Sequence, residues 1–202
     1  MIQLDNSISP SEVVLAELLV WQSGIEGDLP VRLQMAREEW ERRNRQGNPT
    51  MDAVKACLGK MCSGARRCMY CEDSAAKPLD HFWPKALYPD KVFQWENLNQ
   101  ICSDCNSYKW KHFAIFNADG GVEFQHHLLL TDLRSVGAAV LINPRFENPM
   151  DYAVLDLKGT FRFFPHPKLS DSEKKRFDYT FVKVLKLNEG DRDHLMDGRK
   201  QA

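Results

Sequence analysis

The sequence has no long hydrophobic run and no segment of the kind that directs a chain to a membrane. Its longest apolar stretch near the start, Val13 to Trp21, contains Glu17 and is too short to cross a bilayer. The segment Met1 to Ser11 lacks the basic region followed by an apolar region that marks a signal peptide. We therefore expect a soluble, cytoplasmic protein that makes no use of a membrane.

The sequence also has no excess of charge of either sign. It contains 27 Lys and Arg and 28 Asp and Glu, which gives a formal net charge of −1. Such a balance provides no general attraction to a polyanion, so binding to a nucleic acid would depend on local charge or on a partner. The stretch from Lys55 to Phe113 has nine Lys or Arg against six Asp or Glu, a modest excess that permits nucleic-acid binding without requiring it.

Internal repeats and low-complexity segments are missing too, and the first third of the chain has helical signals. We expect one helix to begin at Ser9–Glu12 and to end at Gly24–Asp28, a second to begin near Pro30, and a third to cover Met51–Met61. The second helix carries a run of mixed charge, Arg37–Arg43. This run is either a solvated helix face or a surface that faces a partner or DNA.

The last part of the chain has the signals of a hairpin and of helices. Ala153–Leu157 and Thr160–Phe164 flank Lys158-Gly159, a pair that is typical of a hairpin turn. Ser170–Glu173 is a capping box and predicts the start of a helix, and a short last helix is expected at Asp191–Arg199. A hairpin-and-helix extension is therefore expected after the centre of the chain.

Cysteine occurs in a spaced pattern. In a cytoplasmic protein, six cysteines favour thiolates and metal binding over disulfides. Four of them form two Cys-x2-Cys motifs, and one such turn presents two sulfurs to a zinc ion at ~2.3 Å. Four thiolates leave no open position for a substrate, so the pattern predicts a structural zinc, the alternative being four unrelated cysteines. The predicted ligands are Cys68, Cys71, Cys102 and Cys105, whereas Cys57 and Cys62 are expected to be free thiols.

The segment between the two cysteine motifs has the signals of a strand, a long loop, a second strand and a helix. Leu79–Trp83 and Leu98–Cys102 are short and apolar enough for strands, and Asp104–Phe113 contains no helix breaker. Held together by zinc, these elements would form a ββα unit.

Three polar motifs lie on this ββα segment: Asp80-His81-x-x-Pro84, Trp95-x-Asn97-Leu98 and Cys102-x2-Cys105-Asn106-x-x-Lys109. In order and spacing they resemble the HNH endonucleases, specifically the zinc-knuckle group with a ββα-metal core. The resemblance covers about forty residues and is specific, because several spacings agree together.

The resemblance implies a role for each polar residue in phosphodiester hydrolysis. His81 would be the general base that takes a proton from the attacking water. Asp80 and Asn106 would hold one catalytic Mg²⁺ or Mn²⁺ through oxygens, and an Asn where the family often has His favours these hard ions over zinc. Asn97 would hold the His81 loop or ring in orientation, and Lys109 would meet a phosphate.

Structural alternatives exist for the same residues. A lone histidine on a strand is usually a satisfied surface or core residue, and Asn97 could merely cap a turn. A pure scaffold, however, needs the four cysteines but not Asp80, His81, Asn97 and Asn106 together. The complete polar set therefore favours an enzyme.

Flanking segments extend the resemblance to one group, the PtuB-type HNH subunits of Septu anti-phage systems. These nucleases are encoded with an ATPase, PtuA, and are also found beside retrons. The resemblance implies a DNA-cutting defence nuclease that works with a PtuA-like ATPase, the alternatives being a non-catalytic zinc-binding scaffold or an RNA-cleaving HNH nuclease. The segments that carry it are Arg67–Asp73, Asp80–Lys85, Leu87–Pro89, Leu141–Arg145 and Thr180–Asn188.

Together these patterns predict an α+β fold with a zinc-stabilised ββα-metal core. We expect an N-terminal helical region at residues 1–64, the HNH module at 65–115 and the C-terminal hairpin and helices at 116–202. At 202 residues, these regions are expected to pack as one domain.

Overall fold

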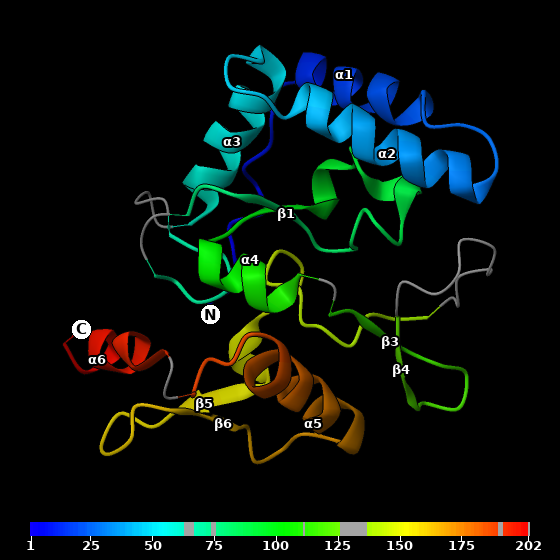
Figure 1. Cartoon of the computed structure of the whole chain (residues 1–202). Coiled ribbons are helices and arrows are strands. Elements are labelled where there is room, and N and C mark those ends of the chain that lie inside the picture. The colour runs from blue at the N-terminus through cyan, green and yellow to red at the C-terminus, as the bar shows by residue number, and fades with distance from the viewer. Residues whose placement is uncertain (63–66, 74–75, 111, 126–136, 190–191, 202) are drawn as a thin grey trace.

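The computed structural model describes residues 1–62, 67–73, 76–110, 112–125, 137–189 and 192–201. It confirms a mixed α+β chain, in which the described strands form three separate antiparallel pairs. In Figure 1 the N-terminal helices form a layer on one side, the C-terminal hairpin and helices lie on the other, and the segment 79–109 lies between them. None of the described helices has the length and apolar character needed to cross a membrane.

The N-terminal layer consists of α1 (Glu12–Ser23), α2 (Leu29–Arg43) and α3 (Pro49–Met61). The side chain of Asp28 accepts a hydrogen bond from the backbone N–H of Val31 at the start of α2, and Asn48 caps α3 in the same manner. Gly24 follows directly after the last residue of α1. The three predicted helices are therefore confirmed, with ends that local capping and breaking residues explain.

The central segment contains β1 (Leu79–His81), β2 (Leu98–Gln100) and α4 (Ser103–Lys109), with short 3₁₀ helices η1 (Pro89–Lys91) and η2 (Trp95–Asn97) in the loop between the strands. β1 and β2 pair antiparallel, with His81 opposite Leu98. The order strand, loop, strand, helix agrees with the prediction, but each element is shorter. α4 ends at Lys109 and not at Phe113, because Trp110 has a φ of 21°, which a right-handed helix cannot contain.

A second hairpin, which was not predicted from the sequence, follows α4 and consists of β3 (Ala114–Phe116) and β4 (Val122–Phe124). Only its turn at Gly120-Gly121 was expected. Gly120 has a φ of 72°, and the Oδ1 atom of Asn117 accepts a hydrogen bond from the backbone N–H of Gly121 at 2.6 Å. Strands of three residues are too short to show a period-2 pattern, so only the two glycines of the turn were visible in the sequence.

The C-terminal part contains a 3₁₀ helix η3 (Pro149–Asp151), β5 (Ala153–Leu155), β6 (Phe163–Pro165), α5 (Asp171–Phe177), a π-helix η4 (Asp178–Val184) and α6 (Asp193–Gln201). The predicted hairpin is present, but its turn is longer than expected. The carboxylate of Asp156 accepts hydrogen bonds from the backbone N–H groups of Lys158–Thr160, and these residues therefore belong to the turn. The capping box between Ser170 and Glu173 is confirmed at the start of α5.

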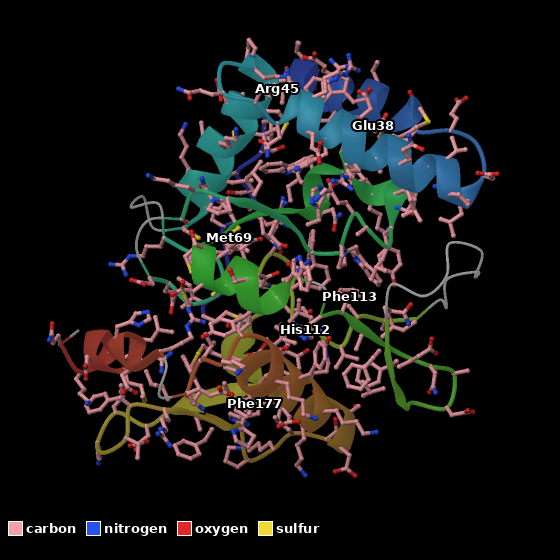
Figure 2. The ribbon with its side chains drawn as sticks, in the orientation of Figure 1. Glu38, Arg45, Met69, His112, Phe113 and Phe177 are labelled. Carbon is pink, nitrogen blue, oxygen red and sulfur yellow. The ribbon has the colours of Figure 1, made fainter. Side chains whose placement is uncertain are left out.

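One cluster of buried apolar side chains extends from Met1 to Leu195 and contains residues from all three predicted regions. Figure 2 shows side chains in the space between the ribbons and labels Met69, Phe113 and Phe177 of this cluster. The N-terminal ammonium group of Met1 lies 2.8 Å from a carboxylate oxygen of Glu72, which joins the start of the chain to the first cysteine motif. Because the regions share this cluster, the domain boundaries at 64/65 and 115/116 stay a prediction.

Candidate functional site

The four cysteines of the two motifs meet in the structure. Their Sγ atoms all lie within 4.8 Å of one another, and all four side chains are buried. The Sγ atoms of Cys71 and Cys102 are 3.6 Å apart. A tetrahedral zinc ion with bonds of ~2.3 Å holds its sulfurs about 3.8 Å apart, whereas a disulfide holds them at about 2 Å. The cluster therefore fits one structural zinc ion, and Cys57 and Cys62 lie outside it.

Each cysteine motif presents its sulfurs from a tight local structure. In the first motif the backbone N–H of Glu72 donates to the carbonyl oxygen of Cys68 at 2.9 Å, and Glu72 has a φ of 66°, so the chain reverses directly after the second sulfur. In the second motif Cys102 is the N-cap residue of α4, and its Sγ accepts a hydrogen bond from the N–H of Cys105 at 3.4 Å. N–H groups at a helix start favour a thiolate over a thiol.

A buried arginine from the C-terminal region contacts this cluster, and it was not predicted from the sequence. Both Nη atoms of Arg192 lie 3.5 Å from the Sγ of Cys105, and the residue is 1% exposed. Nη1 also donates to the carbonyl oxygen of Leu185 at 2.6 Å. A zinc ion with four thiolates carries a net negative charge, which a guanidinium beside one sulfur would partly balance. A single arginine 87 residues from its cysteine leaves no local signal in the sequence.

Three of the predicted catalytic residues line one cavity of about 310 Å³. Asp80 and His81 reach it from β1, and Asn106 reaches it from the exposed side of α4. The cysteine cluster holds the start of α4 against the first motif, which places this helix beside the strand. The cavity is lined by Leu79, Asp80, His81, Pro84, Lys85, Ala86, Asn106 and Trp110.

His81 is held as a neutral imidazole in one orientation. Its Nε2 lies 3.0 Å from the carbonyl oxygen of Val92, which can only accept, so Nε2 carries the proton and Nδ1 keeps its lone pair. The ring packs edge-on against Trp40 at a centroid distance of 4.2 Å. Burial, with a further contribution from the charge of Lys85, lowers the pKa of His81 to about 3. A neutral ring with a lone pair on Nδ1 is the form that a general base requires.

Asp80 forms a buried ion pair with Lys109. The Lys109 Nζ lies 3.0 Å from Oδ1 of Asp80 and donates to the carbonyl oxygen of His81 at 2.7 Å. Burial raises the pKa of Asp80, and the ammonium of Lys109 opposes this shift. Lys109 is 0% exposed, so its ammonium contacts β1 and not the open cavity. This position differs from the phosphate contact that the family resemblance implied.

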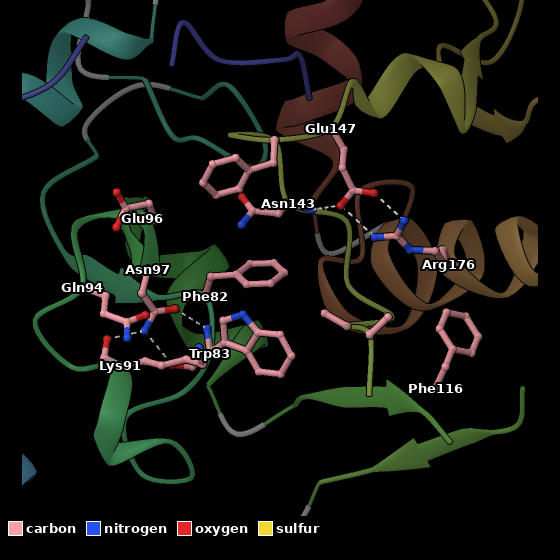
Figure 3. Close-up of a pocket in the computed structure, with 13 residues that line it drawn as sticks. Phe82, Trp83, Lys91, Gln94, Glu96, Asn97, Phe116, Asn143, Glu147 and Arg176 are labelled. Atoms are coloured by element: carbon pink, nitrogen blue, oxygen red, sulfur yellow. Dashed lines mark hydrogen bonds and ion pairs between the residues drawn. The ribbon is translucent and has the colours of Figure 1, made fainter. Parts of the chain in front are cut away.

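Asn97 lies outside the cavity and holds the loop that follows β1. Its Oδ1 accepts a hydrogen bond from the N–H of Trp83 at 2.7 Å, and its Nδ2 donates to the carbonyl oxygens of Trp83 at 3.1 Å and Lys91 at 2.8 Å. Figure 3 shows these bonds at the wall of a neighbouring cavity of about 480 Å³. Val92, the hydrogen-bond partner of His81, follows Lys91 directly. The amide of Asn97 therefore bonds to the segment that orients the imidazole.

Lys85 is a further cation at the catalytic cavity that was not singled out from the sequence. It lines the cavity, and its charge acts to lower the pKa of Asp80. Its side chain is half-buried, and burial lowers its own pKa. In the sequence, the signal that could have identified Lys85 as a site residue was its position directly after Pro84 of the first polar motif. A single lysine in a loop, however, is usually solvated and has no such role.

The fold and the two sites define a class of protein: a small α+β chain with a four-cysteine cluster that could bind zinc, next to a cavity lined by a carboxylate, an imidazole and an amide. No protein-family model matches the chain. The chain is similar to Septu protein PtuB of Bacillus thuringiensis, with 31% identity over 117 residues. The matched region is 55% of this chain and 38% of that relative, so the chain spans well under half of the relative's length.

Proposed function

We propose that this chain is an HNH-type, metal-dependent endonuclease that cuts DNA as a component of a Septu-type anti-phage defence system. The observation that carries the proposal is the cavity shared by Asp80, His81 and Asn106, next to a four-cysteine cluster that fits zinc. The similarity to Septu protein PtuB supports the defence role.

The residues of the cavity would divide the chemistry of phosphodiester hydrolysis. His81 takes a proton from the attacking water at Nδ1, the ring nitrogen with a lone pair. Asp80 and Asn106 would hold one Mg²⁺ or Mn²⁺ through oxygens, and that ion, when bound, polarises the scissile phosphate and stabilises the leaving oxygen. Asn97 positions the His81 ring through the loop that contains Val92.

The two lysines would have separate tasks. Lys109 is buried against Asp80, and we assign it the positioning of that carboxylate. Its ammonium would contact a phosphate, as the resemblance implied, only after leaving this pair. Lys85 lines the open cavity and is therefore better placed to face a phosphate oxygen of the substrate.

We further propose that the nuclease works in the cytoplasm with an ATPase partner of the PtuA type. The formal net charge of −1 gives the chain little attraction to DNA of its own. A partner that binds DNA would supply the missing affinity and would bring the catalytic cavity to the substrate.

The first test is cleavage of supercoiled plasmid by the purified chain with Mg²⁺ or Mn²⁺. We expect His81→Ala to lose cutting by at least about 100-fold, the usual contribution of a general base, with unchanged zinc content. The protein should still fold, with a melting temperature lowered by the loss of the buried ring and of its bond to the carbonyl oxygen of Val92. His112→Ala is the matched control, because His112 is exposed and its ring bonds only to the carbonyl oxygen of Tyr108 among the contacts described. This control should cut as the wild type does.

Other outcomes would change the proposal. Loss of zinc or of folding in His81→Ala would contradict the role of His81 as the base. Cutting of RNA but not of DNA would favour the RNA-cleaving alternative. If the wild type cuts neither polymer, even with its ATPase partner added, the chain is a zinc-binding scaffold.

A further inference from the structure

We propose that a groove beside α2 binds one nucleotide of the substrate strand, next to the phosphate that is cut. This inference rests on the proposed nuclease function and adds a substrate-binding subsite to it. The groove has a volume of about 590 Å³ and lies between the first three turns of α2 and the loop that follows β1. The walls that matter here are formed by Val31, Leu33, Arg37, Trp40, Lys85 and Ala86.

The groove adjoins the catalytic cavity. Lys85 and Ala86 line both of them. Trp40 lines the groove and packs its ring 4.2 Å from the ring of His81. A strand whose scissile phosphate lies at His81 therefore has its neighbouring nucleotide at the mouth of the groove.

The lining suits the two parts of a nucleotide. Val31 and Leu33, with the small part of Trp40 that is exposed, offer an apolar surface to a base, a contact that does not select among bases. Arg37 and Lys85 line the same groove, and their positive charges suit a backbone phosphate. Arg37 pairs with Glu41 at 3.2 Å, but both side chains are exposed, and such a pair is weak enough for Arg37 to turn to a phosphate.

A nucleotide fits this groove better than a segment of a partner protein does. A substrate strand must lie beside the general base His81 to be cut, so it also lies beside this groove. A protein partner can bind elsewhere on the surface. The two cations outnumber the single carboxylate of Glu41 in the lining, which suits an anionic ligand. The binding experiment distinguishes a nucleotide from a protein occupant.

The test compares two groove variants with two matched controls in the full chain. Val31→Glu places a negative charge in the groove at a half-exposed position, and Val13→Glu makes the same change on the exposed side of α1. Arg37→Ala removes a groove cation, and Arg42→Ala removes another exposed, Glu-paired cation of α2 that lies outside the groove. Melting temperatures establish that all four proteins fold.

Binding is measured by fluorescence anisotropy with short labelled single-stranded and duplex DNA, each variant also carrying His81→Ala so that nothing is cut. We expect Val31→Glu and Arg37→Ala to weaken binding at least about fivefold, which corresponds to about 1 kcal/mol of binding free energy. Arg37→Ala should also lower the slope of log affinity against log salt by about 1, as loss of one phosphate contact does. Both controls should match the parent protein.

Cleavage kinetics with His81 intact separate this inference from the proposed function. If the wild type cuts DNA and the groove variants bind and cut as the controls do, the groove subsite is wrong and the nuclease function stands. If the wild type neither binds nor cuts nucleic acid, even with its ATPase partner added, both proposals fall. If the groove variants bind DNA normally but no longer bind the ATPase partner, the groove is a protein interface and the inference is overturned.

Discussion

Replacement of Arg192 by methionine is expected to weaken zinc binding and to leave the catalytic cavity intact. The change removes two N–H groups at 3.5 Å from the Sγ of Cys105 and the positive charge beside the thiolates. Outer-shell partners of this kind contribute about 10–100-fold to metal affinity. The carbonyl oxygen of Leu185 also loses its donor at 2.6 Å, and an unpaired buried acceptor costs about 1–3 kcal/mol of unfolding free energy.

Zinc affinity is measured by competition with a chromogenic chelator, and stability by thermal unfolding with and without excess zinc. Arg145→Met is the matched control, because Arg145 is also 1% exposed but donates to the carbonyl oxygens of Trp95 and Leu98, away from the cysteine cluster. We expect this control to lower the melting temperature without changing the zinc affinity. An Arg192→Met protein that holds zinc as tightly as the wild type would refute the reasoning.

Three further predictions concern other parts of the structure. Cys105→Ser should release zinc and destabilise the chain, since zinc binding contributes on the order of 10 kcal/mol in small sites, and a folded, zinc-loaded variant would count against the four-cysteine site. Asn97→Ala should reduce cutting without loss of zinc because the loop loses three hydrogen bonds of about 1 kcal/mol each, and unchanged kcat would contradict this role. Burial alone would raise the pKa of Glu147, but hydrogen bonds from Arg176 and the backbone of Asn143 lower it below its ordinary value of 4.5. The ionised carboxylate therefore stabilises the fold above that pH, and this stability is lost as the pH falls through the lower folded-state pKa. Acid unfolding of the wild type should be steeper below pH 4.5 than that of Glu147→Gln, and equal slopes would rule this linkage out.

Local signals were enough for the elements whose ends depend on neighbouring residues. Asp28 and Asn48 cap helices that were expected from the sequence, and Ser170 begins another. The paired cysteine motifs predicted that their sulfurs would meet, because a closed zinc site needs four of them. The order of the polar motifs likewise predicted that Asp80 and Asn106 would face one site, and both line the same cavity.

Contacts between distant segments were beyond the reach of these patterns. The strands of the β3–β4 hairpin have three residues each, too few to show a period-2 pattern in the sequence. Ile115 also pairs with Ala139, so a segment more than twenty residues away along the chain helps to hold the hairpin in place. The helix at Asp104 was expected to run to Phe113, but Trp110 adopts a positive φ that its own sequence does not indicate.

The sequence by itself determined the residue types and spacings of both sites, because a tight turn and a short helix fix which side chains are neighbours over a few residues. Only the tertiary structure decided what those side chains contact. It buried Lys109 against Asp80, placed Lys85 in the wall of the cavity and brought Arg192 to Cys105. Such contacts depend on how separate elements pack into one core. Packing brings together residues that are far apart along the chain, and no spacing in the sequence marks them as partners.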